Sequence, residues 1–236
     1  MVVEPRLILF DIDGTLLDSR GAGRDAMVSA GRAVFGPSFR FDHVEFAGQL
    51  DPAILAEAAA ATRHHVTSEQ QRAFERRYLE ALRARLARPP SPFALPGVQA
   101  LLERIDRTPG HGSVRSGLLT GNARAAAGLK LDAAGIARRR FTINAFGDEA
   151  TTRPDLVELA RQRHRDTAGI EVPPHRTVVV GDTPRDVAAA RVHGCVALAV
   201  ATGSYDADVL ADAGADRVVA SLEDPAAIAA VFDGSA

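Results

Sequence analysis

The sequence of 236 residues contains a single cysteine, Cys195, and a single lysine, Lys130. One cysteine excludes an intrachain disulfide framework, which suits a reducing cytosol, and we expect Cys195 to be a small core residue. Long apolar runs are also missing: no segment approaches the length of a membrane span, and the run before Asp11 is too short for a signal peptide. We therefore expect a soluble, cytoplasmic protein with no membrane partner.

Strong charge of one sign is absent too. The formal net charge is −2, the pI is about 6.4, and no basic stripe interleaved with aromatic residues occurs. Such a chain has no positive field for a nucleic-acid backbone, so nucleic acid is not an expected partner. The hydrophobic fraction of 46% can fill a globular core, and the length allows one α/β domain with a smaller inserted unit.

Four short runs rich in valine, isoleucine and leucine have the composition of strands buried on both faces of a parallel sheet. Helical patterns separate the later runs and end at glycines or turns. Strands that alternate with helices predict a doubly wound α/β sheet. The predicted strands are 7–10, 117–120, 177–180 and 196–201, with a weaker one at 217–219, and the predicted helices are 123–134, 156–165 and 185–193.

The interval 20–95 breaks this alternation because one helical pattern follows another. Asp51 is a suitable N-cap with Pro52 at the first helical position, and Thr67 and Gln70 have the spacing of a capping box. The helices expected here are 24–35, 52–62 and 68–87, with a flexible hinge at 21–23 and a stiff one at 89–92.

The domain organisation follows from this insert. We predict an α/β core formed by residues 1–19 and 96–236 and a helical domain formed by residues 20–95. The core, which carries the alternating pattern, is the expected catalytic domain.

Polar residues follow three of the predicted strands. In open α/β sheets ligands bind beyond the carboxyl ends of the strands, so these residues should converge on one crevice. The three strand ends are Asp11-Ile12-Asp13-Gly14-Thr15, Thr120-Gly121-Asn122 and Gly181-Asp182-Thr183-Pro184-Arg185-Asp186.

The residue types at these strand ends indicate phosphoryl transfer. Several carboxylates in one crevice repel one another unless a cation lies between them, and Mg²⁺ is the natural partner of oxygen ligands. Gly14 and Gly121 allow close approach of the backbone, and the amides after Asp11 with the Thr120 hydroxyl suit phosphoryl oxygens. Together with Asn122, these residues form a candidate phosphate site.

Asp11 and Asp13 can take different roles. A strict strand would send them to opposite faces, but just past a strand end, where the chain turns, both can face the crevice. A metal-bound Asp11 stays ionised and can attack phosphorus, while Asp13 can protonate the leaving oxygen and later take a proton from water. The alternative interpretation, a polar turn that merely closes a strand, leaves the other two strand ends unexplained.

The three segments resemble the first, second and fourth motifs of the haloacid dehalogenase superfamily, and the resemblance spans nearly the whole chain. It implies a Rossmann-like core with an inserted helical cap, at the place where the helical insert is predicted independently. It also implies that Asp11 is the nucleophile, Asp13 the acid and base, and Thr120 a phosphate ligand. By the same resemblance Asp182 and the backbone carbonyl of Asp13 hold Mg²⁺, and Asp186 supports or ligates the metal.

The third motif of that superfamily is usually a lysine, and the match is imperfect here. At the expected place, upstream of a helix, the chain has Arg153, which can contact a phosphate through two nitrogens. Lys130 is the rival, but it lies about two turns into the helix after Thr120, roughly 12 Å along the axis. We therefore predict that Arg153 fills the role and that Lys130 is a surface or snorkelling lysine.

The presence of Asp13 favours a phosphatase, because a halide leaves without protonation and dehalogenases place no acid there. The resemblance is greatest to phosphoglycolate phosphatase-like hydrolases. A β-phosphoglucomutase-like phosphotransferase and a non-catalytic phosphometabolite-binding protein on the same fold remain alternatives. The expected partner is a small phosphorylated metabolite, and the expected assembly is a monomer or a homodimer.

The substrate should be selected by the insert. Gln49 stands where similar proteins frequently have an arginine, which weakens the case for a second anionic group on the substrate. Arg20 and Arg24, next to the first hinge, can compensate. We therefore take Gln49 and Arg24 as candidate substrate contacts and leave the substrate open.

Overall fold

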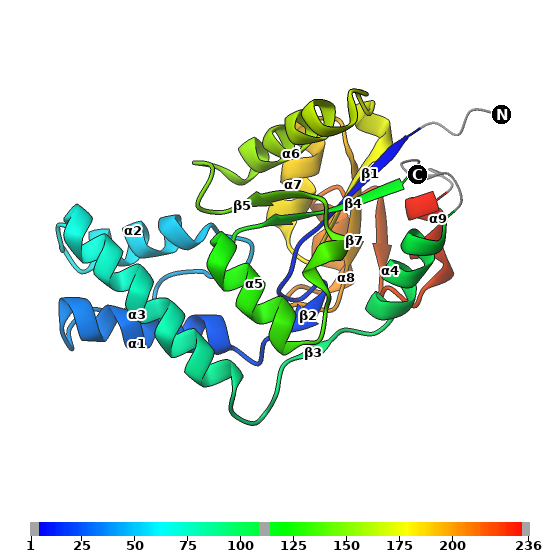
Figure 1. Ribbon diagram of the computed structural model, residues 1–236. Helices are drawn as coiled ribbons and strands as arrows, with labels where there is room; N and C mark the ends of the chain where they lie inside the picture. Colours follow the sequence, from blue (N-terminus) through cyan, green and yellow to red (C-terminus); the bar gives the residue numbers. More distant parts are fainter. Residues whose placement is uncertain (1–4, 109–113, 233–236) are drawn as a thin grey trace.

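A computed structural model describes residues 5–108 and 114–232. Over these residues six parallel strands form one sheet in the order β5-β4-β1-β6-β7-β8 (Figure 1). Because β1 lies between β4 and β6, the carboxyl ends of these three strands are neighbours. The strands are β1 Arg6–Phe10, β4 Val114–Thr120, β5 Ile143–Phe146, β6 Thr177–Gly181, β7 Val196–Val200 and β8 Arg217–Val219.

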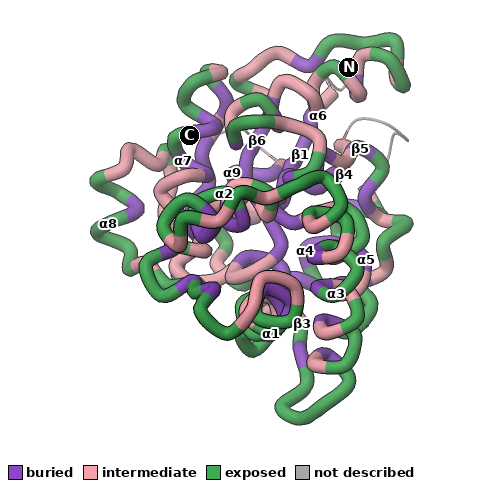
Figure 2. Tube along the Cα trace, turned by 90° about the vertical axis from the view of Figure 1, so that its left-hand side faces the viewer, coloured by how far each residue is buried: buried purple, intermediate pink, exposed green. Residues whose placement is uncertain are grey.

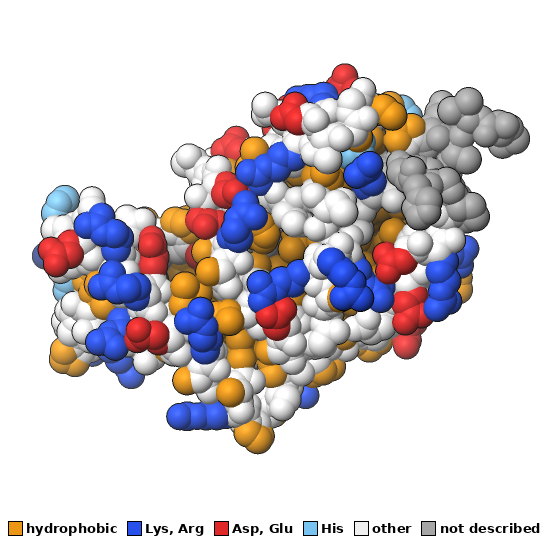
Figure 3. All heavy atoms as spheres, in the orientation of Figure 1, with side chains coloured by type: hydrophobic (Ala, Val, Ile, Leu, Met, Phe, Trp, Pro, Cys, Tyr) orange, Lys and Arg blue, Asp and Glu red, His pale blue; other side chains and the backbone are white. Residues whose placement is uncertain are grey.

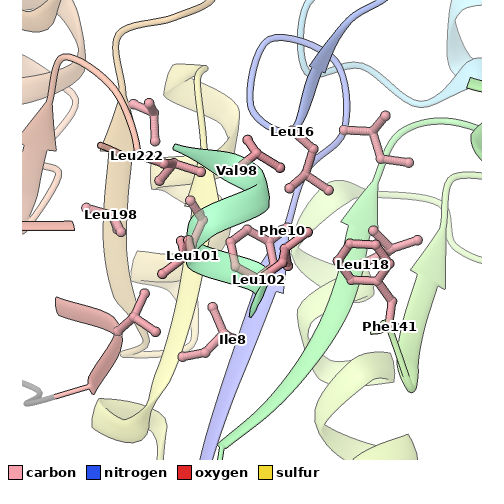
Figure 4. Packing of buried hydrophobic residues seen from close by; sticks show 14 of the residues in the cluster. Ile8, Phe10, Leu16, Val98, Leu101, Leu102, Leu118, Phe141, Leu198 and Leu222 are labelled. Carbon is pink, nitrogen blue, oxygen red and sulfur yellow. The ribbon is translucent and has the colours of Figure 1, made fainter. Parts of the chain in front are cut away.

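Helices cover both faces of this sheet. This is required because successive apolar side chains of β1 point to opposite faces. Ile8 and Phe10 point into one hydrophobic cluster, which Figure 4 shows around α4, and Leu7 and Leu9 point into another on the opposite face. The Rossmann-like, doubly wound core is thus confirmed. The first face carries α4 Val98–Arg107, α5 Arg124–Ala133 and α9 Pro225–Phe232, and the second carries α6 Arg153–Ala168, α7 Pro184–Val192 and α8 Ala207–Asp212.

Three helices that follow β1 in the sequence form the helical insert, which lies at the left of Figure 1. They are α1 Ala22–Phe35, α2 Asp51–Ala61 and α3 Ser68–Leu86. Their apolar faces share a third cluster that contains Phe39, Phe41 and Phe74. The insert therefore has an apolar cluster of its own, which Ala126 of α5 completes. In Figure 2 the buried segments concentrate in the sheet, and the helices expose their outer faces.

The segment that enters the insert pairs with the segment that leaves it. A short antiparallel ladder joins β2 Leu17–Asp18 to β3 Phe93–Ala94 at the base of the insert. Strands of two residues carry no periodic signal, so the sequence did not predict them. The expected flexible hinge at 21–23 is also mostly helical, because Gly21 is the N-cap of α1.

Other differences from the predicted elements have local causes. The capping box of Thr67 and Gln70 is confirmed. Asp51, in contrast, is the first residue of α2 and does not cap it: its Oδ2 accepts a hydrogen bond of 2.9 Å from the N–H of Ala123, the N-cap of the core helix α5. The edge strand β5 was not predicted, because it has only four residues and Asn144 interrupts its run of apolar residues. No helix within residues 5–108 and 114–232 is both long and apolar enough to cross a membrane.

Candidate active site

A cavity of about 410 Å³ lies between the carboxyl ends of the sheet strands and the insert. Asp11 and Asp13 both reach it because the chain turns directly after β1. The carbonyl of Ile12 accepts hydrogen bonds from Leu16 and Leu17, and Gly14 takes a left-handed φ of 76°. On the opposite wall the insert contributes side chains from α1, α2 and α3.

The first group of residues at this cavity is a buried acidic cluster. One carboxylate oxygen from each of Asp11, Asp182 and Asp186 lies within 4.8 Å of the others. Burial, together with the neighbouring carboxylates, raises the pKa of Asp11 to about 6 and that of Asp182 to about 8, despite the opposing charge of Arg153. The cluster is thus short of positive charge, and its oxygen donors fit a divalent cation such as Mg²⁺.

Asp186 is already engaged on both oxygens. Its Oδ2 accepts from the Thr183 N–H at 3.1 Å and from the Thr183 hydroxyl at 2.7 Å, as the capping box of α7 requires. Its Oδ1 accepts from Arg153 Nε at 2.9 Å and Nη2 at 2.5 Å. Asp186 therefore orients Arg153 as well as the start of α7.

The structure brings Arg153 to the acidic cluster, as expected for the residue in the third-motif position. This first residue of α6 is buried, and its Nη2 lies 3.1 Å from Asp11 Oδ2. Burial alone would lower the pKa of Arg153, but the charges of Asp186 and Asp11 raise it, so the guanidinium stays charged. Its remaining nitrogen, Nη1, donates to the carbonyl of Gly48 in the insert at 3.0 Å. One side chain thus contacts both the core carboxylates and the insert.

The prediction that Lys130 is a surface or snorkelling lysine was wrong. Lys130 is only 4% exposed, and its Nζ donates to Asp13 Oδ2 and to Asn122 Oδ1, both at 2.6 Å. Helical side chains point toward the N-terminus of their helix, and α5 begins at Arg124, so the long side chain spans the distance that the axial rise suggested was too great. The buried neighbours Ala126, Ala127 and Leu131 on the same face were the signal that could have indicated burial.

Asp13 belongs to this second network and not to the acidic cluster. Its carboxylate accepts from Lys130, from Asn122 Nδ2 at 2.9 Å and from Ser19 Oγ at 2.8 Å. Burial would raise the pKa of Asp13, but the charge of Lys130 and the three donors lower it overall. The two aspartates of the first motif therefore stand in different electrostatic environments, which is the arrangement that separate roles require.

The candidate phosphate residues surround these networks. Thr120 is fully buried at the end of β4, and its hydroxyl accepts from Asn122 Nδ2 at 2.8 Å, which leaves the hydroxyl proton free to be donated. A side chain on Gly14 would meet Asp182 at 2.3 Å, and one on Gly121 would meet the Gln49 carbonyl at 2.0 Å. Glycine is thus required at both positions for the backbones to approach this closely.

Two of the three residues expected to contact the substrate line the cavity, and the third does not. Arg24 lines the cavity at its exposed rim, with its guanidinium 5.5 Å from the ring centre of Phe46. Gln49 also lines it, but its side chain donates to Glu57 within the insert at 2.7 Å. Arg20 is not among the lining residues and pairs with Asp18 at 3.3 Å.

One wall of the site was missed by the sequence analysis. Thr202 and Gly203, just after β7, line the cavity; the Thr202 hydroxyl donates to the Gly14 carbonyl at 2.5 Å. A side chain on Gly203 would lie 1.7 Å from Asp182 Oδ2, so this loop closes directly over that carboxylate. The rule that ligands bind beyond strand ends applied equally to the predicted strand 196–201 and would have found these residues.

Replacing Lys130 by methionine should destabilise the protein in a pH-dependent way. We expect a loss of about 1–3 kcal/mol in unfolding free energy at pH 7, less than for a fully buried pair because the Asp13 side chain is 36% exposed. The folded pKa of Asp13 is lowered, so the pair stabilises above the ordinary value of 3.8 and its contribution fades as the pH falls. The loss should therefore shrink in urea denaturation at pH 3.5.

Arg138→Met is the matched control for Lys130→Met. It removes the cation of an exposed pair with Asp132, which lies on α5 as Lys130 does, and should cost at most about 1 kcal/mol. Equal losses for the two variants at pH 7 would contradict the assignment of Lys130 as a buried partner of Asp13.

Comparison with known proteins agrees with this fold. The chain resembles a solved hydrolase from Pseudomonas syringae, with 25% identity, a TM-score of 0.70 and coverage of 94% of this chain and 96% of that one. CbbY from Rhodobacter sphaeroides in complex with phosphate is 24% identical, with a TM-score of 0.71 and coverages of 93% and 96%. A predicted phosphoglycolate phosphatase from Haemophilus somnus is 19% identical, with a TM-score of 0.67 and coverages of 97% and 99%.

No curated protein sequence shows significant similarity to the chain. The family model for haloacid dehalogenase-like hydrolases, however, matches residues 5–194. This match covers all three motifs and most of the chain, and it confirms the resemblance drawn from them. The chain therefore belongs to the haloacid dehalogenase-like hydrolases.

Proposed function

We propose that this hydrolase is a Mg²⁺-dependent phosphatase that cleaves a small phosphorylated metabolite through an aspartyl-phosphate on Asp11. The observation that carries the proposal is the separation of Asp11 and Asp13: Asp11 lies in the acidic cluster with Arg153, and Asp13 in the network of Lys130. A nucleophile and a proton-transfer group are thus adjacent but differently tuned. The fold shared with CbbY, whose structure contains phosphate, supports the same class of ligand.

The residues that would hold the metal are Asp11 and Asp182 through their side chains and Asp13 through its backbone carbonyl. Asp186 would support the site by orienting Arg153, because both of its oxygens already accept hydrogen bonds. When bound, Mg²⁺ supplies positive charge that keeps the carboxylates ionised and stabilises charge on a phosphoryl group.

The chain's own groups account for both chemical steps. A carboxylate oxygen of Asp11 attacks phosphorus, the bond from phosphorus to the leaving oxygen breaks, and Asp13 gives its proton to that oxygen. In the second step Asp13 takes a proton from water, the water oxygen attacks phosphorus, and the bond from Asp11 to phosphorus breaks to release phosphate. The products are an alcohol and inorganic phosphate, and both aspartates return to their starting states.

Asp13 must hold a proton for the first step, although Lys130 favours its ionised form. Binding of a phosphoryl dianion beside it adds negative charge and raises its pKa, which favours the protonated form when the substrate arrives. Arg153, the Thr120 hydroxyl, Asn122 and the backbone near Gly14 and Gly121 are the proposed phosphate contacts.

Two alternatives use the same residues. A β-phosphoglucomutase-like phosphotransferase would return the phosphoryl group from Asp11 to a second hydroxyl and release no net phosphate. A non-catalytic binding protein would bind phosphorylated metabolites without turnover. Mg²⁺-dependent release of inorganic phosphate from a panel of phosphate monoesters, and its loss in Asp11→Asn, distinguishes the phosphatase from both.

We further propose that residues 20–95 act as a cap domain over a core of 1–19 and 96–236. The insert has its own apolar cluster, and its loop before α2 contacts the core through defined polar bonds. Arg185 donates to the Ala47 carbonyl at 2.6 Å and pairs with Glu45 at 2.8 Å, and Tyr205 donates to the same glutamate. Closure of such a cap would exclude water until the aspartyl-phosphate forms.

Metal binding should depend on Asp182 and on pH. Because the folded pKa values of Asp11 and Asp182 are raised, the metal-free folded protein binds more protons than the unfolded chain between about pH 4 and pH 8. Its stability should fall as the pH rises through that window, and added Mg²⁺ should restore about 2.7 kcal/mol at one hundred times its dissociation constant.

Calorimetry and thermal unfolding at pH 6 and pH 8 check this expectation, with tighter Mg²⁺ binding expected at pH 8. Asp182→Asn should abolish the Mg²⁺ effect, whereas Asp25→Asn, at an exposed carboxylate of the insert, should leave it intact. Undiminished Mg²⁺ stabilisation of Asp182→Asn would overturn the assignment of this ligand.

Replacing Asp13 by asparagine should reduce turnover of an alkyl phosphate by about 100-fold to 10,000-fold, because an alkoxide must be protonated as it leaves. An aryl phosphate with an acidic leaving group needs less help, so its first step should survive better and phosphoenzyme should accumulate. Rapid-quench measurements on both substrates test this, with Asp11→Asn as the control that forms no phosphoenzyme. Equal, small losses on both substrates without a trapped intermediate would refute the role of Asp13.

The cap contacts give a structural prediction. Glu45→Gln weakens the bond between the insert and the core, and we expect it to shift the population toward a more open form by up to about 5-fold, the effect of 1 kcal/mol. Glu57→Gln is the matched control because the hydrogen bond of Glu57 goes to Gln49, within the insert.

Distances between spin labels at Glu69→Cys in the insert and Asp166→Cys in the core would report the opening. The native Cys195 is buried and does not compete for label. A beryllofluoride complex of the otherwise wild-type protein should show the shorter distance. Distance distributions that do not change with either Glu45→Gln or beryllofluoride would contradict a moving cap.

A further inference from the structure

A second cavity, of about 320 Å³, adjoins the first between α2, α3 and the start of α5. The two cavities share three lining residues, Met27, Asp51 and Tyr78, which therefore form the partition between them. The volume lies in the range of sites for small organic ligands. A substrate whose phosphate lies at Asp11 could therefore extend past these three residues into the second cavity.

The walls of the second cavity are mainly apolar. Four side chains of the insert, Leu55, Val66, Phe74 and Leu79, line it, and Ala125 contributes from the core. On the face shown in Figure 3, hydrophobic side chains come to the surface along the junction of the insert with the core. A ligand group that fits these walls is an alkyl or aromatic group rather than a second phosphate or a carboxylate.

The partition carries a polar pair that lacks a full set of partners. The Tyr78 hydroxyl is buried and makes no hydrogen bond of acceptable geometry within the described residues. Burial raises the pKa of Tyr78 well above its ordinary value, and the charges of Asp51 and Asp13 and the hydrogen-bonding proximity of Asp51 add to this, so the hydroxyl keeps its proton. Asp51 uses Oδ2 to accept from the Ala123 N–H, and among the residues that the structure describes no hydrogen bond of good geometry occupies its other oxygen. Asp51 is the near acceptor, but it is not aligned for a hydrogen bond of good geometry. A buried hydroxyl held in this way is costly, and a ligand group between the two side chains would relieve that cost.

We propose that the substrate is a phosphate monoester of a hydroxylated alcohol with an apolar end, whose hydroxyl contacts Asp51 and Tyr78 and whose apolar end occupies the second cavity. This rests on the proposed phosphatase function. Tyr78 donates a hydrogen bond to the oxygen of the substrate hydroxyl, and that hydroxyl donates a hydrogen bond to Asp51. A second anionic group is disfavoured at the partition because Asp51 is itself a carboxylate.

The charges around the first cavity support this substrate class. Of the three cationic residues that line it within the described ranges, Lys130 pairs with Asp13, and Arg153 pairs with Asp11 and Asp186. Arg24 is the remaining one, and it lies at the exposed rim over Phe46. A bisphosphate would therefore leave its second phosphate beside Asp51 or at the rim.

A series of unbranched alkyl phosphates of two to eight carbons tests the apolar part. Binding to Asp11→Asn and kcat/KM of the wild-type enzyme should both rise by about 4-fold for each methylene that enters the second cavity, the equivalent of 0.8 kcal/mol. A carboxylate at the end of the chain should cancel this gain. Values of both quantities that do not change with chain length would overturn the inference.

Matched variants locate the effect. Ala56→Trp places a large side chain in the second cavity and should remove the dependence on chain length while leaving the two-carbon substrate unchanged. Ala60→Trp, one turn further along α2 and outside the cavity, should behave as wild type. Ala125→Phe fills the same cavity from the core side and serves if the tryptophan variant does not fold. Retention of the chain-length dependence in a folded cavity-filling variant would refute the proposed location.

The polar pair is tested with monophosphates of alkanediols against alkyl phosphates of equal length. Tyr78→Phe should lose about 2-fold to 12-fold of the preference for the diol, the range of one neutral hydrogen bond. Asp51→Asn keeps an acceptor for Ala123 and places an amide donor beside the substrate, so it should reduce that preference as well. An unchanged preference in both variants would overturn the role of the pair.

The binding measurements separate this inference from the proposed function. Length-dependent binding to Asp11→Asn without turnover by the wild type would refute the phosphatase and leave the apolar site standing. Turnover of short phosphates with no dependence on chain length in either measurement would leave the phosphatase standing and refute the apolar site.

Discussion

The architecture of the site depends on the repulsion among carboxylates that the sheet brings to one edge. Asp11, Asp182 and Asp186 are buried within 4.8 Å of one another, which is unfavourable without positive charge between them. Two cations divide the acids into two groups: Arg153 stays with the cluster, and Lys130 holds Asp13 apart from it. This division lets two aspartates that are two residues apart differ in the direction of their pKa shifts.

The arginine at position 153 also links the site to the insert. Its Nε and Nη2 contact the carboxylates, and its Nη1 reaches the carbonyl of Gly48. A lysine, with one compact ammonium group, cannot present donors in this fork. The insert and the carboxylates of the acidic cluster therefore share a partner, and the position of the loop around Gly48 is coupled to the orientation of Arg153.

The strand-end residues were predictable from sequence because their placement needs only the order of the elements. Asp11, Asp13 and Asp182 follow apolar runs, and a parallel sheet brings the ends of such runs together. The contacts of Lys130 were not predictable from the axial rise of the helix alone, because the length and direction of its side chain decide which groups the Nζ reaches. Asp51 was misassigned as a helix cap because its partner, Ala123, lies on the core, and the docking of the insert is a tertiary property that local spacing does not encode.

The burial of Lys130 has a consequence for the chemistry of the protein surface. It is the single lysine of the chain and is 4% exposed, so no ε-amino group is freely presented to solvent in this conformation. Gly23 of α1 packs over it: a Cβ there would lie 2.9 Å from Nζ. Acylating reagents and amine-directed cross-linkers that act on exposed lysines should therefore react with Lys130 only if the insert moves away from α5, as the proposed cap movement requires. The reactivity of this amine is thus a natural reporter of that movement, with no label needed.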